Sequence, residues 1–395
     1  MEKALLLYSG GLDTSVMVRW IKEKMNMDVV TLTLDIGNSD LEEIKEKALK
    51  LGAIDAITLD VKKEFADNYI SREIHANGLY GEYPLSTALA RPLMAEKAVS
   101  VANENDIKFI AHGSTGKGND QVRFEVSINA LDNNIKVIAP VREWNMTRAD
   151  ELEYAKMNNI YVKSDGKYSV DENIWGRSIE GSSIENINEP VNDDAFEWVT
   201  PPQYCGSGEP VSIEFYKGLP SSLNGKSMDL LSIIKNLNII AGRNGIGIIN
   251  MIESRLIGLK SHEVYECPAA SVILKAHKYL ENLILNKNEL SVKNYIDNFW
   301  SNMVYNGLWF DPSMEHMNQF EKSSNQYITG SVNLRLYRGN MILEGIESPY
   351  SLYDYNTINY ETGVFDQGSS KGFIDIYKNE TVRSNRVKKA LTVIH

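Results

Sequence analysis

Short apolar runs alternate with amphipathic segments through the first third of the chain, and this alternation limits the possible folds. The runs typical of buried strands are 4–8, 28–37, 56–61, 107–113 and 136–140. Between them, apolar residues recur at helical spacing. Strands that alternate with helices predict right-handed crossovers and a doubly wound parallel sheet of the α/β class. Ligands of such sheets bind beyond the carboxyl ends of the strands, so we expect a site in the loops that follow Tyr8, Asp35, Ala111 and Pro140.

The predicted helices of this region cover 14–24, 62–74 and 87–105, with a further helix between the last two strands. Two more helices are predicted to begin with capping boxes, one formed by Ser39 with Glu42 and one by Thr147 with Asp150.

The character of the sequence changes after about residue 165. Residues 166–210 are polar and show little periodicity, which predicts long functional loops. Later segments predict a helix at 226–237, two helices within 268–308, a hairpin within 327–347 and a basic amphipathic helix at 382–394. We therefore expect three parts, an α/β domain at 1–165, a second α+β domain at 166–365 and a C-terminal helical arm at 366–395.

Composition excludes several classes of protein. The net charge of −12 disfavours general nucleic-acid binding, which needs clustered Lys and Arg. No run approaches the roughly 20 apolar residues that span a bilayer, and the apolar run at the N-terminus is too short for a signal peptide. Cys205 and Cys267 are too few and too far apart for a disulfide framework or a zinc site. We expect a cytoplasmic protein with no nucleic-acid partner, no membrane partner and no metal-ligating side chains.

The first loop with chemical character is Ser9-Gly10-Gly11-Leu12-Asp13-Thr14-Ser15, which follows a strand and opens a helix. The two glycines are predicted to take positive φ and to let the backbone approach a ligand closely. The helix start directs N–H groups and the positive end of its dipole at one point, which is an arrangement that binds phosphate. The alternative is a plain strand–turn–helix with an N-cap.

The second loop runs from His112 to Phe124, with the sequence HGSTGKGNDQVRF, and also joins a strand to a helix. Gly118 follows Lys117 where a Walker A loop has Ser or Thr, so a P-loop NTPase is excluded. Asn119 and Arg123 share a helix face, where Arg123 could hold a carboxylate while Asp120 accepts hydrogen bonds from an ammonium group. This combination suits an amino-acid ligand. The alternative is a capped surface helix with an Asp–Arg pair.

Both loops carry a family resemblance. The first resembles the pyrophosphate loop of the N-type ATP pyrophosphatases, which have the adenine nucleotide alpha hydrolase-like fold. The second resembles the argininosuccinate synthase family almost residue for residue. Further matching segments are 83–92, 136–144, 168–178, 252–269 and 347–353, so the resemblance covers essentially the whole chain. Two departures are Ser86-Thr87-Ala88, where some relatives have Gly-Thr-Ser, and Val141, where relatives have Trp.

The resemblance implies a carbon–nitrogen ligase of arginine biosynthesis. Such an enzyme joins L-citrulline to L-aspartate and releases AMP and pyrophosphate through a citrullyl-AMP intermediate. It uses ATP as a substrate with Mg²⁺ and has no prosthetic group. The resemblance also implies a homotetramer, with the C-terminal arm docked on a neighbouring subunit. Residues 1–165 would bind the nucleotide, and 166–365 would serve substrate binding and multimerisation.

The same resemblance assigns site residues. No side chain is a nucleophile, because the substrate itself attacks, and Asp13, Asn119 and Arg123 act by positioning. The ATP-binding positions implied are Leu7, Tyr8, Ser9, Gly10, Gly11, Leu12, Asp13, Thr14, Ser15, Leu34 and Gly113. The citrulline-binding positions implied are Tyr83, Thr87, Asn119, Arg123, Ser169, Ser178, Glu253 and Tyr265. The aspartate-binding positions implied are Thr115, Asn119 and Asp120.

Two other functions compete with this hypothesis. One is another N-type ATP pyrophosphatase, such as a tRNA-modifying adenylating ligase, which the acidic charge and the two isolated cysteines disfavour. The other is a non-catalytic nucleotide-binding protein, which would not explain the polar motifs after residue 168. Trp300, Tyr305 and Trp309 are predicted to be core residues.

Overall fold

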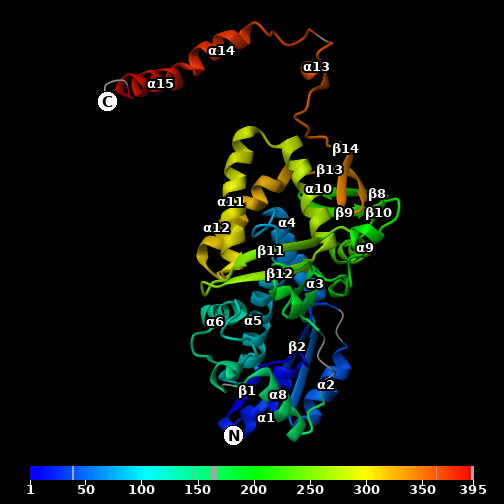
Figure 1. Ribbon diagram of the computed structural model, residues 1–395, viewed down its shortest axis with the longest axis vertical. Coiled ribbons are helices and arrows are strands. Elements are labelled where there is room, and N and C mark those ends of the chain that lie inside the picture. The colour runs from blue at the N-terminus through cyan, green and yellow to red at the C-terminus, as the bar shows by residue number, and fades with distance from the viewer. Residues whose placement is uncertain (38–39, 145, 162–166, 362, 393–395) are drawn as a thin grey trace. The chain divides into compact units, whose positions relative to one another are not determined.

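The computed structural model describes residues 1–37, 40–144, 146–161, 167–361 and 363–392. The chain divides into two compact units, Met1–Tyr350 and Ser351–His395. Both are drawn in Figure 1.

The predicted doubly wound parallel sheet is present at the start of the first unit. Its strands are β1 (Lys3–Leu7), β2 (Asp28–Asp35), β3 (Asp55–Asp60), β4 (Phe109–Ala111) and β5 (Lys136–Ile138). Their order is β3-β2-β1-β4-β5, and every neighbouring pair is parallel. The strand order reverses between β1 and β4, so the switch point of the sheet lies between the loops that follow these two strands.

Alternate residues of β1 enter two different cores, as expected for a sheet covered on both faces. Leu5 and Leu7 belong to the larger core cluster, which also contains residues of α5 (Ser86–Glu104). Ala4 and Leu6 belong to a second cluster with residues of α1 (Leu12–Met25). Further helices of this region are α2 (Leu41–Lys50), α6 (Asp120–Leu131), α7 (Pro140–Glu143) and α8 (Arg148–Met157).

The helix starts confirm one predicted capping box and correct another. Thr147 and Asp150 form the capping box of α8. Helix α2 begins instead with Asp40 as its N-cap, which accepts a hydrogen bond from the Glu43 N–H, and Ser39 lies outside the described residues. Asp40 offers the same kind of oxygen acceptor one residue later. The sequence therefore predicted an oxygen-bearing N-cap correctly but placed it one residue too early.

The helix predicted at 62–74 contains an irregular turn. It consists of α3 (Lys62–Phe65), a π-helical turn (Ala66–Ile70) and α4 (Ser71–His75) in direct succession. A π turn adds one residue to the usual helical repeat and is often found at functional sites.

The remainder of the first unit holds two antiparallel sheets. One has the order β10-β9-β8-β13-β14 and the other β11-β12-β7-β6. Their strands are β6 (Ser169–Asn173), β7 (Gly176–Glu180), β8 (Glu209–Tyr216), β9 (Leu219–Leu223), β10 (Lys226–Ser227), β11 (Ile248–Ser254), β12 (Lys260–Glu266), β13 (Gly330–Tyr337) and β14 (Asn340–Glu347). Figure 1 shows β11 and β12 between the helices α5 and α6 and the helices α11 and α12.

Several predictions for this part need correction. Residues 166–210 are not loops throughout, because β6 and β7 form a hairpin there. Helix α9 (Leu230–Arg243) begins four residues later than predicted, since Lys226 and Ser227 form a strand and Asp229 is its N-cap. The predicted helices α10 (Pro268–Ile284) and α11 (Lys287–Tyr305) and the predicted β13–β14 hairpin are confirmed, whereas α12 (Pro312–Ser324) was not predicted.

The second unit contains α13 (Tyr355–Ile358), α14 (Ser369–Tyr377) and α15 (Asn379–Thr392). The predicted tail helix corresponds to α15 and starts three residues earlier, whereas α14 was not predicted. Within the described part of the chain, none of the helices is long and apolar enough to cross a membrane.

Candidate functional site

The two loops singled out by the sequence meet at the switch point of the parallel sheet. β1 and β4 are hydrogen-bonded neighbours, and both loops leave from their carboxyl ends. Gly113 lies so close to the start of α1 that a Cβ atom built on it would be 3.1 Å from Thr14 Cγ2 and 3.4 Å from Met17 Sδ. The glycine at 113 thus lets the two loops pack closely, since a Cβ there would require Thr14 or Met17 to shift by a few tenths of an ångström.

The first loop presents the open end of a helix. Gly11 is the N-cap of α1, and no side chain caps its N–H groups. Gly10 has φ +78°, as predicted, but Gly11 has φ −69°, so the prediction of positive φ was wrong for Gly11. The backbone at Gly11 would therefore allow a side chain, and an unusual φ does not explain the glycine.

Hydrogen bonds fix this loop. Ser9 Oγ lies 3.2 Å from Thr14 Oγ1 and accepts a bond from the Gly11 N–H at 3.4 Å. Ser15 Oγ and Lys47 Nζ both donate to the carbonyl oxygen of Gly10, at 3.4 and 2.5 Å. The lysine adds a positive charge beside a helix start that already favours anions.

Other predicted ATP-binding positions are buried next to this loop. Tyr8 is buried, and its hydroxyl lies 3.3 Å from Ser15 Oγ. Leu7, Leu12 and Leu34 are also buried in the core. Asp13 lies in the first turn of α1.

The second loop ends in a series of ion pairs that involve Asp120. Asp120 Oδ1 accepts from Arg123 Nη1 at 2.9 Å, and Asp120 Oδ2 accepts from Arg91 Nη2 at 2.7 Å. Arg91 Nη2 also donates to Asp171 on β6 at 2.5 Å. Burial raises the pKa of Asp120, but the positive charges of Arg91 and Arg123 outweigh it and bring the pKa to about 2. Asp120 is therefore ionised at neutral pH.

The Asp120–Arg123 pair exists, but not on a surface helix. The Arg123 side chain is 5% exposed. Its Nε donates to the Tyr305 carbonyl oxygen at 3.0 Å, and its guanidinium lies 5.0 Å from the centre of the Tyr305 ring. Arg123 Nη2 is buried without a hydrogen-bond partner among the described residues. A buried unpaired guanidinium N–H is costly unless a ligand supplies an acceptor.

Asn119 ties the second loop to the α+β part. It makes no side-chain cap on α6. Its Nδ2 donates to the Tyr305 hydroxyl at 2.9 Å, and its Oδ1 accepts from the Leu256 N–H at 2.8 Å. The amide is thereby held in one orientation.

A tyrosine–glutamate network continues from this point. Glu253 accepts hydrogen bonds from the hydroxyls of Tyr305 at 2.8 Å and Tyr265 at 2.9 Å. The Tyr265 ring stacks on Tyr83 with centroids 4.1 Å apart. Burial raises the pKa of both Tyr83 and Tyr265, so their hydroxyls stay protonated and available as donors.

Of the other predicted citrulline positions, Thr87 and Ser178 contact this network and Ser169 does not. The hydroxyl of Tyr83 accepts from the Thr87 N–H at 2.7 Å, and Thr87 Oγ1 lies 2.9 Å from Ser178 Oγ. Five of the eight positions are therefore joined directly by contacts: Tyr83, Thr87, Ser178, Glu253 and Tyr265. Tyr305 connects both Asn119 and Arg123 to them. Ser169, at the exposed start of β6, pairs with Glu180 of β7 and is not among these contacts. Thr115, predicted for aspartate, is exposed in the second loop.

Three site residues were missed by sequence reasoning. Arg91 joins Asp120 to Asp171, Tyr305 joins Asn119 to Glu253, and Arg255 pairs with Glu180 at 2.6 Å and Glu263 at 2.7 Å. Tyr305 is buried as predicted, but it is also part of the site. The only available signal was Arg91 within the apolar first half of helix α5, because a buried arginine requires a partner.

The described residues contain no group of three or more His, Cys, Asp or Glu side chains arranged to hold a metal ion. Both cysteines are buried free thiols.

Comparison with known proteins covers nearly the whole chain. Two family models match, described as the arginosuccinate synthase N-terminal HUP domain over residues 3–161 and the arginosuccinate synthase C-terminal domain over residues 168–382. The argininosuccinate synthase of Thermoplasma volcanium is 57% identical over 384 residues, which is 97% of this chain and 97% of the relative. That of Thermoplasma acidophilum is 56% identical over 385 residues, 98% of this chain and 96% of the relative. Among solved structures, a crystal structure described as a predicted subunit of tRNA methyltransferase from Methanocaldococcus jannaschii aligns with a TM-score of 0.29 and 19% identity. The alignment covers 40% of this chain and 76% of that chain.

Proposed function

This chain belongs to the argininosuccinate synthase family, and we propose that the residues around its sheet switch point carry out the family's reaction. That reaction ligates L-citrulline and L-aspartate at the expense of ATP in arginine biosynthesis. The observation that carries the proposal is the junction of the two loops at Gly113 and Thr14, next to the Asn119–Tyr305–Glu253 network. This junction supports a proposed phosphate-binding helix start close to a proposed amino-acid site.

The first loop is proposed to hold the ATP phosphates. The uncapped N–H groups at the start of α1 and the hydroxyls of Ser9, Thr14 and Ser15 are donors, and Lys47 supplies a positive charge. Asp13 is proposed to position the loop. Mg²⁺ is proposed to enter on the triphosphate, where it would neutralise phosphate charge. No prosthetic group is proposed.

Citrulline is proposed to bind between Arg123 and Glu253. The unpaired Nη2 of Arg123 is suited to the α-carboxylate. Glu253 has two of its acceptor positions occupied by tyrosine hydroxyls and retains others for the α-ammonium group. Tyr83, Thr87, Ser178 and Tyr265 would line the stem, and Ser169 would complete the site from the hairpin.

Aspartate is proposed to bind at the start of α6. Asp120 stays ionised and can accept from the substrate ammonium group, while the Thr115 hydroxyl and the Asn119 amide are proposed donors for a carboxylate. Arg91 would hold Asp120 in place.

The proposed mechanism needs no protein nucleophile. The ureido oxygen of citrulline attacks the α-phosphorus of ATP, the bond to the bridging oxygen breaks and pyrophosphate leaves. The amine of aspartate then attacks the ureido carbon of citrullyl-AMP, and AMP leaves. The protein's contribution is to align these atoms and to stabilise charge at phosphorus.

We further propose the division of labour among the parts of the chain. Residues 1–165 bind nucleotide, 166–365 bind substrate and multimerise, and 366–395 form an oligomerisation arm in a cytoplasmic homotetramer. The arm has exposed apolar side chains such as Phe373 and Ile376, which a neighbouring subunit would cover.

The test is to measure AMP and pyrophosphate formed from ATP with both amino acids, and then with each omitted in turn. Citrulline labelled with ¹⁸O in the ureido group should transfer the label to AMP. Unlabelled AMP during argininosuccinate formation would contradict attack by the ureido oxygen.

A further inference from the structure

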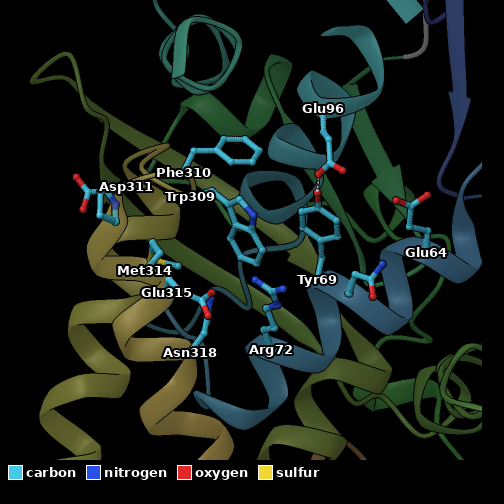
Figure 2. Close-up of a pocket in the computed structure, with 12 residues that line it drawn as sticks. Glu64, Tyr69, Arg72, Glu96, Trp309, Phe310, Asp311, Met314, Glu315 and Asn318 are labelled. Atoms are coloured by element: carbon cyan, nitrogen blue, oxygen red, sulfur yellow. Dashed lines mark hydrogen bonds between the residues drawn. The ribbon is translucent and has the colours of Figure 1, made fainter. Parts of the chain in front are cut away.

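A cavity lies away from the residues assigned to the reaction. Its volume is about 510 Å³, within the range of small-molecule sites. It is bounded by the irregular 62–75 helix, α5 and the start of α12, as Figure 2 shows. Its lining residues are Glu64, Asn68, Tyr69, Arg72, Glu96, Trp309, Phe310, Asp311, Pro312, Met314, Glu315 and Asn318. None of them is among the positions proposed for ATP, citrulline or aspartate.

The floor of this cavity is aromatic and rigid. Tyr69, from the π-helical turn, stacks on Trp309 with centroids 4.9 Å apart and an interplanar angle of 20°. Trp309 also meets Trp300 edge-on at 6.1 Å. The Arg72 guanidinium lies 5.5 Å from the centre of the Trp309 ring. Such a surface attracts cations and planar groups.

Opposite charges face this cavity without pairing. Among the described residues, Arg72 has no carboxylate within ion-pair distance, and Glu96 and Glu315 have no cation. Glu96 accepts only a hydrogen bond from the Tyr69 hydroxyl at 2.7 Å, and Glu315 one from Gln319 at 2.6 Å. A cation and two anions separated by a cavity form the complement of a ligand that carries both kinds of charge.

An unpaired donor strengthens this inference. Trp309 is 8% exposed, and no acceptor for its indole N–H is found among the described residues. Figure 2 shows the nitrogen edge of the indole turned toward the side of the cavity where Phe310 and Glu96 lie. This N–H is accessible from the cavity and can donate to a ligand carboxylate.

We propose that this cavity binds a free basic α-amino acid. Arg72 and the Trp309 N–H hold the α-carboxylate, and Glu96 and Glu315 receive the two cationic ends. The aliphatic stem lies on the aromatic floor. A basic side chain is favoured over a neutral one, because Glu96 and Glu315 have no cation partner among the described residues and Arg72 is the one basic residue of the lining. The proposal does not depend on the assignment of the reaction site.

The experiment is isothermal titration calorimetry of the full chain with L-arginine, without ATP and with saturating L-citrulline and L-aspartate to occupy the reaction site. One binding event per chain is expected. Arg72→Gln and Glu96→Gln should each weaken it at least about tenfold. The matched control is Glu104→Gln, on the same helix α5 but outside the cavity, which should leave the affinity unchanged. Thermal unfolding of each variant verifies that it is folded.

Two analogues test the two ends of the ligand. Agmatine lacks the carboxylate and L-norleucine lacks the side-chain cation, so each should bind at least about tenfold more weakly than L-arginine. The proposal is overturned by the absence of binding at about 10 mM L-arginine, or by equal affinity of wild type, Arg72→Gln and Glu96→Gln. Binding that survives in Arg72→Gln and disappears in Asp120→Asn would place the ligand in the reaction site and also overturn it. None of these results bears on the proposed ligase function.

Discussion

The hydroxyl of Tyr305 lies 2.8 Å from Glu253 Oε1 and 2.9 Å from Asn119 Nδ2, so one tyrosine joins the second loop to the substrate side of the α+β part. Its ring stacks on Tyr80 with centroids 3.6 Å apart, which keeps the hydroxyl in place. Glu253 and Tyr305 are 52 residues apart in the chain.

Tyr305→Phe should impair the use of citrulline without unfolding the protein. The substitution keeps the stacked ring and removes one hydrogen-bond donor to Glu253, which changes the position of that carboxylate. We expect kcat/KM for citrulline to fall about 10- to 100-fold, equivalent to roughly 1.4 to 2.7 kcal/mol. The matched control is Tyr80→Phe, which keeps the other ring of the stack and loses only a 3.4 Å bond to Ser254. Equal losses in both variants would mean that the bond from the Tyr305 hydroxyl to Glu253 has no specific role in the use of citrulline.

The sequence predicted the parallel sheet because its strands are buried on both faces and therefore form continuous apolar runs. It did not predict the β6–β7 hairpin, where Ser169–Asn173 is polar and mostly exposed and so lacks the pattern of a buried strand. The role of Tyr305 was also hidden, because burial of the ring is a local expectation whereas the partners of its hydroxyl are set by tertiary structure.

Gly11→Val should abolish ATP use while the fold survives. Gly11 has φ −69°, and a Cβ there would meet only Ser9 Oγ at 3.4 Å, so the native backbone tolerates a side chain. The added side chain would instead block the approach of phosphate to the uncapped N–H groups of α1. We expect KM for ATP to rise more than about tenfold, with an unchanged thermal midpoint.

The control for this variant is Gly206→Val, because a Cβ at Gly206 meets nothing within 4 Å. It should leave both KM and the midpoint unchanged. An unaltered affinity for ATP in Gly11→Val would remove the first loop from the ATP site.

Asp120→Asn should affect aspartate more than citrulline. The substitution removes the negative charge proposed to meet the ammonium group of aspartate, and leaves one amide oxygen that can accept from either Arg91 or Arg123 but not from both. We expect KM for aspartate to rise at least about tenfold and KM for citrulline to change less than about threefold. Equal changes for the two substrates, in steady-state assays with ATP saturating, would mean that Asp120 acts only by holding Arg123.

The same residue predicts an acid dependence of stability. The pKa of Asp120 falls from an ordinary value of 3.8 to about 2 in the folded protein. Its stabilising contribution is fully present above pH 3.8 and is lost as the pH falls toward 2, since the unfolded chain takes up the proton first. The difference amounts to roughly 2 kcal/mol. Urea unfolding of wild type and Asp120→Asn from pH 6 downward should give a gap that narrows by this amount, and a constant gap would contradict the ion pairs.

Lys293→Met should destabilise the fold without touching the proposed site. The Lys293 side chain is fully buried, and its Nζ lies 2.6 Å from Glu321, 2.7 Å from Asp297 and 3.1 Å from Glu281. Burial lowers the pKa of Lys293, but these carboxylates outweigh it and raise the pKa above its ordinary value. Methionine would remove the one fully buried cation that contacts all three carboxylates, at a cost of about 3–5 kcal/mol in the free energy of unfolding. Lys278→Met is the control, because Lys278 pairs with the same Glu281 at 2.9 Å from a side chain that is 34% exposed. Its replacement should cost less than about 1 kcal/mol in the same urea titration, and a loss as large as that of Lys293→Met would show that burial of the charge is not the decisive factor.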